Sequence, residues 1–361
     1  MTRRNLLLAL LLTAATAARA AEIPLVTDPS AGAPRVALMR NGAAFAWSSP
    51  EGLHAAVVDS RGTLAADQQL ILATSNFGPA AVASNGEHAL FVWTENGLVK
   101  AELLPPLNNS FNPQILGEDP GVAPPAVAWN GTRYVVVWSH VSNAIVSRTV
   151  DGNGVPESGI RVLSPGGADV ARRISIASAN GDSLVAWDRY TYNLPASTRA
   201  TRTELAVLAA DGAPRSGPRV LTASGFSPAV ASNGTEFFAV WTNFDGQQLV
   251  GATVSADGTL RPEQTITAGR DAKLAWDGAH YVLLWMNPVG NRTRVYYAFL
   301  SESGALVTNA VDVGGDTSEY DVSARPQNGE VAVVVGPSTR LTSVIRVVYV
   351  DPVRARPARR F

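Results

Sequence analysis

The stretch PAVASNGTEFFAVW, Pro228 to Trp241, decides the fold, because the chain repeats it in several versions. Residues 125–138 read PAVAWNGTRYVVVW, which differs at few positions. The other copies occupy residues 35–47, 80–93, 174–187, 272–285 and 322–335. Their turn glycines are Gly42, Gly86, Gly131, Gly181, Gly234, Gly278 and Gly329, at separations of 44 to 53 residues. A period of this size indicates a repeat architecture with one supersecondary unit per copy.

Each copy predicts antiparallel strands. A short run of small and β-branched residues precedes Asn-Gly, which favours a two-residue type I′ hairpin turn because both residues tolerate positive φ. The next strand is apolar on both faces, as expected when sheets stack face to face. A third strand such as residues 249–255 follows, then an Asp-Gly turn such as Asp257-Gly258, and a fourth strand.

Seven such units predict an all-β fold, a seven-bladed β-propeller with four antiparallel strands per blade. The seventh unit ends after its third strand, residues 343–351. Residues 23–34 resemble the fourth strands of other units, so we expect the N-terminal strand to complete the last blade and close the ring. The hairpin turns argue against a helical solenoid. The prediction is one domain over residues 21–353, followed by a basic C-terminal tail, residues 354–361.

The first twenty residues are typical of a secretory signal peptide. Arg3 and Arg4 precede an apolar run, and Ala18-Arg19-Ala20 fits a small-residue cleavage pattern. The apolar run is too short for a membrane anchor. The two arginines fit either the general secretory route or twin-arginine export. We expect an exported protein, periplasmic or extracellular, with no membrane span after cleavage.

Composition excludes several classes of function. The chain of 361 residues is 46% hydrophobic and 16% charged, with a net charge of −1 and no cysteine. The charge gives no electrostatic basis for nucleic-acid binding. Thiol catalysis and cysteine-bound zinc are excluded, and neither the histidines nor the Asp-Gly turns have the spacing of a metal site. We therefore expect no metal, no cofactor and a monomer.

In wording, the units resemble the Trp-bearing propeller repeats of exported bacterial proteins, with the motif A-V-A-x-N-G followed by an aromatic-aliphatic strand that ends in Trp. The resemblance covers nearly the whole chain after the signal peptide. It implies an architecture and no particular activity.

One tryptophan recurs in six of the seven units, and the copy at residues 322–335 lacks it. These residues are Trp47, Trp93, Trp138, Trp187, Trp241 and Trp285. We interpret them as packing residues that fill the wedge between blades, rather than as a ligand cage. Trp129 and Trp276, which precede turns, are expected to pack on the turn face.

Function is expected where the copies differ. The second-to-third-strand loops and the blade-to-blade connections share one face and vary in length, and variable loops on a rigid scaffold commonly carry binding sites. The longest loop spans residues 188–202 and contains Tyr and Arg, which often anchor ligands. The candidate ligand-binding residues are Asp188, Arg189, Tyr190, Tyr192, His140, Phe244 and Arg292. The connection at residues 316–321 contributes to the same face. A solvated insertion without function is the alternative for this loop.

The sequence contains none of the common catalytic motifs. The leading hypothesis is a non-enzymatic exported propeller that binds a protein or glycan through the variable-loop face. The alternatives are a hydrolase or lyase that acts on polysaccharide, at that face or in the central channel, and a structural module of the cell envelope. Two carboxylates within about 10 Å of each other in a deep axial pocket would favour the enzyme.

Overall fold

The protein consists of β-strands joined by short turns. A computed structural model describes residues 22–26, 32–59, 70–105, 111–191, 201–243, 247–290, 292–316, 319–336 and 345–349. Twenty-eight strands, β1 to β28, run through these residues, and the strand pairs among them are antiparallel. The predicted signal peptide (1–20), the predicted C-terminal tail (354–361), Tyr192 and Phe244 lie outside the described residues.

The strands form seven four-stranded sheets, of which six are made of strands consecutive in the chain. Blades 1 to 3 are β2–β5 (Gly32–Met39, Gly42–Ser49, Gly52–Asp59, Leu70–Ala73), β6–β9 (Ala81–Ser84, Ala89–Glu95, Leu98–Leu104, Gln114–Glu118) and β10–β13 (Ala126–Trp129, Tyr134–Ser139, Ile145–Val150, Arg161–Ser164). Blades 4 to 6 are β14–β17 (Val170–Ala179, Asp182–Tyr190, Thr201–Leu208, Pro214–Thr222), β18–β21 (Gly225–Ser232, Phe237–Asn243, Gln248–Val254, Gln264–Ala268) and β22–β25 (Arg270–Trp276, Tyr281–Val289, Arg292–Leu300, Val311–Asp316).

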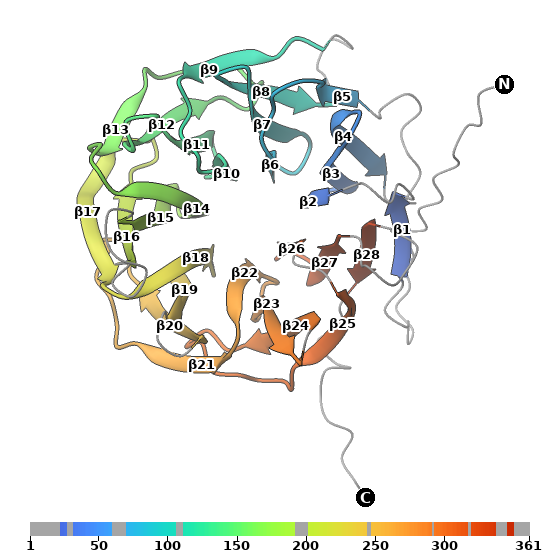
Figure 1. Ribbon diagram of the computed structural model, residues 1–361, viewed down its shortest axis with the longest axis vertical. Helices are drawn as coiled ribbons and strands as arrows, with labels where there is room; N and C mark the ends of the chain where they lie inside the picture. The colour runs from blue at the N-terminus through green and yellow to red at the C-terminus, as the bar shows by residue number, and fades with distance from the viewer. Residues whose placement is uncertain are drawn as a thin grey trace, which may run out of the picture.

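The remaining sheet is composite. It joins β26–β28 (Tyr320–Arg325, Glu330–Val335, Ile345–Tyr349) to β1 (Glu22–Val26), in the order β1-β28-β27-β26. Glu22 pairs with Val348 and Ile23 with Val347, so the N-terminal strand is the outer strand of this blade. Of the seven repeat copies in the sequence, six therefore supply a whole sheet and the last supplies three strands. This pairing joins the two ends of the chain around the ring (Figure 1).

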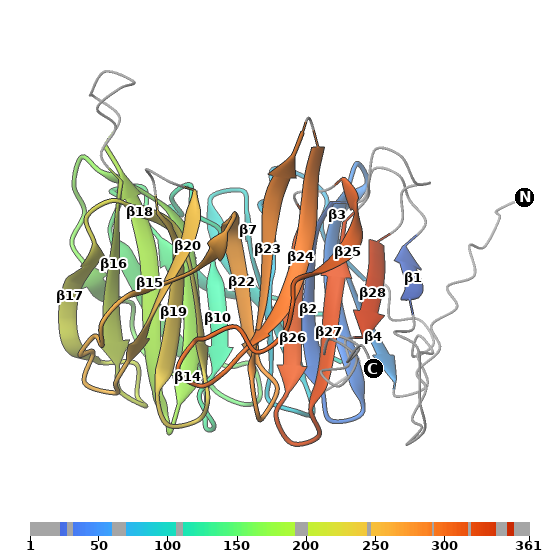
Figure 2. The same ribbon diagram turned by 90° about the horizontal axis from the view of Figure 1, so that it is seen from below.

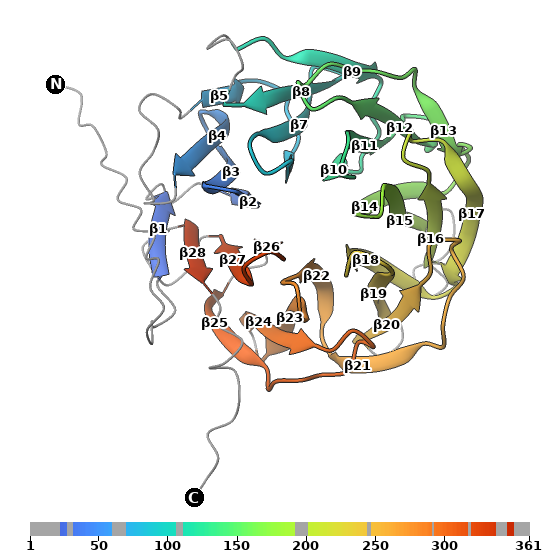
Figure 3. The ribbon, with the colours of Figure 1, turned by 180° about the vertical axis from the view of Figure 1, so that it is seen from behind.

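The sheets stand around a central axis, which confirms an all-β propeller with four antiparallel strands per blade (Figures 1 and 3). The innermost strands are β2, β6, β10, β14, β18, β22 and β26. The strands run between two faces (Figure 2). First-to-second and third-to-fourth turns lie on one, the hairpin face. Second-to-third loops and blade-to-blade connections lie on the other, which we call the loop face.

Five of the hairpins differ from the prediction of a two-residue type I′ turn. In blades 2, 3, 5, 6 and 7 the turn has four residues, because the pairing resumes only at Ala89, Tyr134, Phe237, Tyr281 and Glu330. In blades 2, 3, 5 and 6 the side chain of the first turn residue explains the longer turn. Asn130 Oδ1 accepts the backbone N–H groups of Thr132 and Arg133, at 3.1 and 3.0 Å. Such side-chain capping stabilises a wider turn than the type I′ geometry. Blade 4 keeps the predicted form, with Asn180 and Gly181 at φ +49° and +88°.

The core lies between the blades. The six recurrent tryptophans are only 0–2% exposed, as expected for packing residues. Trp241, for example, packs against Leu205 and Val207 of the preceding blade. A Cβ at Gly225 would lie 2.6 Å from the ring of Trp241, so a glycine at the start of β18 leaves room for the indole. Trp129 and Trp276 are partly buried against Tyr134 and Tyr281, with ring centroids 4.8 Å apart in both pairs.

Candidate functional site

An axial cavity of about 750 Å³ is lined by the innermost strands. Its size falls in the range of ordinary ligand pockets. Six blades are made of strands that are consecutive in the chain. In each of them, one residue that lines the cavity pairs with the residue immediately before the recurrent tryptophan of that blade. In ring order these equivalent residues are Arg35, Ala81, Ala126, Ser175, Ala229 and Lys273. Asp321 on β26 lines the same cavity. The cavity wall is thus small and apolar at blades 2, 3 and 5 and charged at blades 1, 6 and 7.

The charged part lies at the end of the cavity that opens on the loop face. Arg35, Arg173 and Lys273 all lie in the first four residues of their innermost strands, which begin at the loop face. Each of these strands has an irregular pairing at this point. The irregularity is typical of a β-bulge, which redirects side chains near functional sites.

Backbone strain accompanies the irregular pairing of β22 and a similar irregularity in β18. Ser227 and Asp271 have φ values of +56° and +55°, in the left-handed region that residues other than glycine rarely adopt. Their N–H groups are held by side chains from elsewhere in the ring. Ser227 donates to Asp188 Oδ2 at 2.9 Å, and Asp271 donates to Thr242 Oγ1 at 3.1 Å. Strained residues persist where their surroundings fix them in this way, and they concentrate at functional sites.

The carboxylates that line the cavity already have protein partners. Asp271 Oδ1 forms an ion pair with Arg173 Nη2 at 3.2 Å, which crosses from blade 4 to blade 6. Asp321 Oδ2 accepts the backbone N–H of Val36 at 3.3 Å, and Glu319 Oε2 accepts that of Ala33 at 2.7 Å. These bonds satisfy the inner edges of the strands, which have no neighbouring strand at the axis.

Two cations of the cavity differ from these carboxylates. Among the residues that the structure describes, neither Arg35 nor Lys273 has an ion-pair partner. Arg35 Nη1 donates to the neighbouring carbonyl of Pro34 at 2.8 Å. Burial lowers the pKa of the Lys273 ammonium, and the nearby positive charge of Arg35 lowers it further, although Asp321 acts in the opposite direction. A cationic group with a lowered pKa in a cavity is a candidate functional group.

Asp188, a predicted ligand-binding residue, lies in the interior. Its side chain is fully buried, and its two oxygens accept the backbone N–H groups of Arg173 and Ser227, both at 2.9 Å. Burial raises the pKa of this carboxyl, against the effect of these bonds and of the Arg173 charge. Asp188 therefore holds β14 and β18 together near the starts of these strands.

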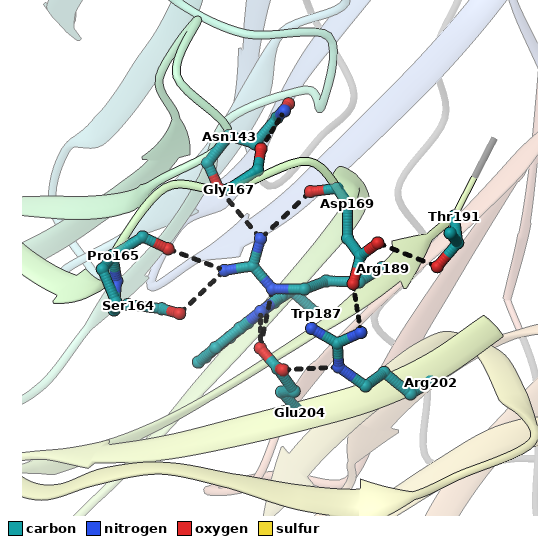
Figure 4. A network of polar contacts seen from close by, with 10 residues as sticks. All are labelled: Asn143, Ser164, Pro165, Gly167, Asp169, Trp187, Arg189, Thr191, Arg202 and Glu204. Carbon is teal, nitrogen blue, oxygen red and sulfur yellow. Dashed lines mark hydrogen bonds and ion pairs between the residues drawn. The ribbon is translucent and has the colours of Figure 1, made fainter. Parts of the chain in front are cut away.

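Arg189 is also buried, and its guanidinium is used within the protein (Figure 4). It pairs with Glu204 Oε2 at 2.8 Å and donates to Ser164 Oγ at 2.7 Å and to the carbonyl of Asn143 at 3.0 Å. Glu204 also accepts from Trp187 Nε1 and Arg202. Burial alone would raise the pKa of Glu204, but the two arginines together lower it below its usual value. The network fastens blade 4 to the loops of blade 3.

The other predicted residues lie on the loop face without forming one cluster. Tyr190 is half-buried at the end of β15, with the Arg172 guanidinium 5.2 Å from its ring centre. Burial and the neighbouring Asp188 raise the pKa of Tyr190 to about 12. His140 is half-buried in the blade 3 loop and contacts Ser142 at 2.8 Å. Arg292 begins β24 in blade 6. Arg189 donates to the carbonyl of Asn143, which brings the His140 loop next to Arg189.

Arg35, Arg173 and Lys273 were not among the predicted site residues. A signal was available for Arg35 and Lys273, because these charges replace the first alanine of the A-V-A run in blades 1 and 6. Arg173 lies two residues before the equivalent position of blade 4, which is Ser175. Asp321 and Glu319 did fall within the connection assigned to the loop face. Within the described residues there is no group of three potential metal ligands and no helix with the length and apolar character of a membrane span.

No protein-family model and no curated protein sequence matches this chain. Solved structures do match. A structure from a study of two prolyl endopeptidases has a TM-score of 0.57 and 13% identity, and the match covers 90% of this chain and 47% of that one. A puromycin-hydrolyzing peptidase of Mycobacterium tuberculosis has a TM-score of 0.55 and 14% identity, with 89% and 52% covered. The β-propeller domain of the Trilobed protease from Pyrococcus furiosus has a TM-score of 0.52 and 7% identity, with 87% and 94% covered.

These similarities define the class of protein as a β-propeller. The chain spans about half the length of the peptidases that it matches, whereas it matches nearly all of the isolated propeller domain. At such low identity the likeness shows the fold alone, because one fold hosts many unrelated functions.

Proposed function

We propose that this chain is an exported β-propeller that binds a protein or glycan ligand at its loop face, with the mouth of the axial cavity as the central contact. The proposal rests on the asymmetric distribution of charge in the wall of that cavity. Side chains from four blades bring charge to one end of a channel whose equivalent positions are otherwise small. A concave site with a few convergent polar groups is the usual form of a ligand site.

Catalysis is the alternative function, and Asp271 and Asp321 are the residues that favour it, because both carboxylates line the cavity. Glycoside hydrolysis needs one carboxyl group as acid and another as base or nucleophile. Asp271 is paired with Arg173 and Asp321 holds a backbone N–H, so both already have structural partners. This favours binding over hydrolysis. Incubation of the purified chain with polysaccharides and peptides would detect cleavage, and any cleavage lost in Asp271→Asn would support the enzyme.

A matched pair of double variants tests the binding site. Arg173→Gln/Asp271→Asn removes an ion pair between blades at the loop face, and Arg40→Gln/Glu87→Gln removes one of 3.0 Å between exposed hairpins on the other face. Both leave the net charge unchanged. Wild type and variants are applied to glycan and peptide arrays, with circular dichroism to check folding. We expect the first variant to bind about tenfold or more weakly and the second to bind like wild type. Equal binding by both variants, or no ligand for the wild type, would contradict the proposal.

Export is the second part of the proposal and rests on the sequence of residues 1–20. The test is expression of the full chain followed by mass spectrometry of the protein in each cell fraction. We expect a product outside the cytoplasm that begins at Ala21. Full-length protein found only in the cytoplasm would contradict export without affecting the binding proposal.

A further inference from the structure

We infer that the axial cavity binds a carboxylate carried on a slender apolar body, with Lys273 and Arg35 as its counter-ions. The inference rests on the proposed function and names the ligand class for the same site. Two sources share this chemistry, the C-terminal end of a peptide with small side chains and a small organic acid.

Arg35 and Lys273 are the charges of the cavity wall that are left for a ligand. The three lining carboxylates each have a partner, namely Arg173 for Asp271 and backbone N–H groups for Asp321 and Glu319. Among the described residues, Arg35 and Lys273 have no carboxylate within ion-pair distance. An added carboxylate would give these partly buried cations an ion-pair partner.

Lys273 and Arg35 lie on either side of the innermost strand of blade 7. Lys273 on β22 and Arg35 on β2 occupy equivalent positions, each opposite the residue before its blade tryptophan. Blade 7 lies in the ring between the blades of Lys273 and Arg35. Its Asp321 accepts a hydrogen bond from the backbone N–H of Val36 through Oδ2. The two cations thus flank one sector of the cavity wall, and a carboxylate with two oxygens suits such a pair of donors.

The part of the cavity wall across the ring from these cations is small and apolar. The equivalent positions across the ring are Ala81, Ala126 and Ala229, and Pro124 and Pro228 also line the cavity. These residues offer apolar surface without polar side chains.

Two serines of the wall already use one lone pair of the hydroxyl oxygen to accept a backbone N–H group. Ser175 Oγ accepts the N–H of Val230 at 3.1 Å, and Ser323 Oγ accepts that of Leu38 at 3.0 Å. A glycan would lose water from many hydroxyls and regain few hydrogen bonds here, whereas an apolar body would not. The cavity wall therefore favours an apolar carboxylate over a sugar.

The lowered pKa of Lys273 is consistent with a carboxylate ligand. Burial lowers its pKa in the empty cavity; Arg35 and Arg173 act in the same direction, and Asp321 and Asp271 oppose them. A bound carboxylate adds an opposite charge and raises the pKa again. By linkage, binding and protonation favour each other. Affinity therefore falls as the pH rises through the lowered pKa of Lys273, at a lower pH than an ordinary lysine would give.

The chain contains two lysines, Lys100 and Lys273, which gives a direct readout. The full chain is labelled with ¹³C,¹⁵N-lysine and titrated with tetra-alanine that has a free C-terminus. Parallel titrations use the C-terminal amide of the same peptide, hexanoate and galacturonate. We expect the free peptide to shift the Lys273 side-chain signal and leave that of Lys100 in place, with the amide binding at least about tenfold more weakly. Hexanoate binding more tightly than the peptide would identify a small acid as the source.

Variants separate this inference from the proposed function. Lys273→Gln and Arg35→Gln should each weaken tetra-alanine binding about tenfold or more, and Arg40→Gln on the hairpin face should leave it unchanged. Equal binding of the acid and the amide, or tighter binding of galacturonate, would overturn the inference. If an array ligand binds the loop face and Lys273→Gln does not change its affinity, the inference fails and the proposed function stands. If tetra-alanine binds as expected but no array ligand is found, the proposed function fails and the carboxylate site stands.

Discussion

Asp188 on β15 accepts a hydrogen bond of 2.9 Å from the backbone N–H of Ser227 on β18, across 39 residues of sequence. Its other oxygen accepts the N–H of Arg173 on its own blade. In the equivalent position after the blade tryptophan, Thr242 uses its hydroxyl for one such bond to Asp271. Asp188 thus fixes the starts of two strands, β14 and β18, whereas Thr242 fixes the start of one, β22.

Asp188→Ala should destabilise the fold more than Thr242→Val. The first change leaves two N–H groups without an acceptor and the second leaves one, at a cost of about 1 to 3 kcal/mol for each buried group. We expect losses of about 2 to 6 and about 1 to 3 kcal/mol in the free energy of unfolding, measured by urea denaturation. Equal losses would show that only one of the Asp188 bonds matters.

Glu204→Gln should reveal the buried network around Arg189. Removing one partner of a buried ion pair costs about 3 to 5 kcal/mol. The folded-state pKa of Glu204 lies below its ordinary value, so its contribution is present above about pH 4.5 and is lost as the pH falls through the lowered pKa. The difference between wild type and variant should therefore shrink below pH 4.5 in urea denaturation.

Glu236→Gln is the control for that experiment. Glu236 pairs with an exposed Arg261, whose side chain is 62% accessible. An exposed pair contributes about 0 to 1 kcal/mol. A loss in this control as large as in Glu204→Gln would contradict the role of burial.

Trp241→Ala should cost about 3 to 5 kcal/mol, because it opens a cavity between blades 4 and 5. Val220→Ala removes a residue that is 54% exposed and should change stability by about 0.5 kcal/mol or less. Thermal and urea unfolding measure both. A loss under about 1 kcal/mol at Trp241 would mean that the indole does not fill the wedge.

Asn130→Ala should cost more than Asn233→Ala. Both asparagines cap their own turn through Oδ1, but Asn130 Nδ2 also donates to the carbonyl of Ala210 in blade 4 at 2.9 Å. The extra bond should contribute about 0.5 to 1.5 kcal/mol to the difference. Identical unfolding midpoints for the two variants would rule out a contribution from the contact between blades.

Lys273→Met should stabilise the fold at neutral pH. The pKa of Lys273 is lowered in the folded state, so its protonation opposes folding below that pKa, and wild-type stability rises as the pH passes through the lowered pKa towards 10.5. The variant lacks this dependence. Urea denaturation at pH 7 and pH 10 measures the free energy of unfolding of wild type and variant. Lys100→Met is the control, and it loses an ion pair to Glu95. A less stable Lys273→Met would assign the lysine a structural role.

The repeat period predicted the propeller because each copy contains its own strands and turn, which are local properties of the chain. The copies also predicted the burial of Trp241 and its equivalents, since a two-sided apolar strand needs cover on both faces. The four-residue turns were missed, because the Asn130 side chain competes with the type I′ geometry through bonds that Asn-Gly alone does not indicate.

The sequence by itself determined the class of fold, the strand order and the positions where the copies diverge. Only the tertiary structure decided that Asp188 and Arg189 face inward to protein partners, and that Lys273 and Arg35, 238 residues apart, occupy equivalent places around one cavity. The physical reason is ring closure. Strand formation depends on neighbours in the chain, whereas convergence at the axis depends on the register of every blade, and a shift of one residue would turn each of these side chains to the other side of its strand.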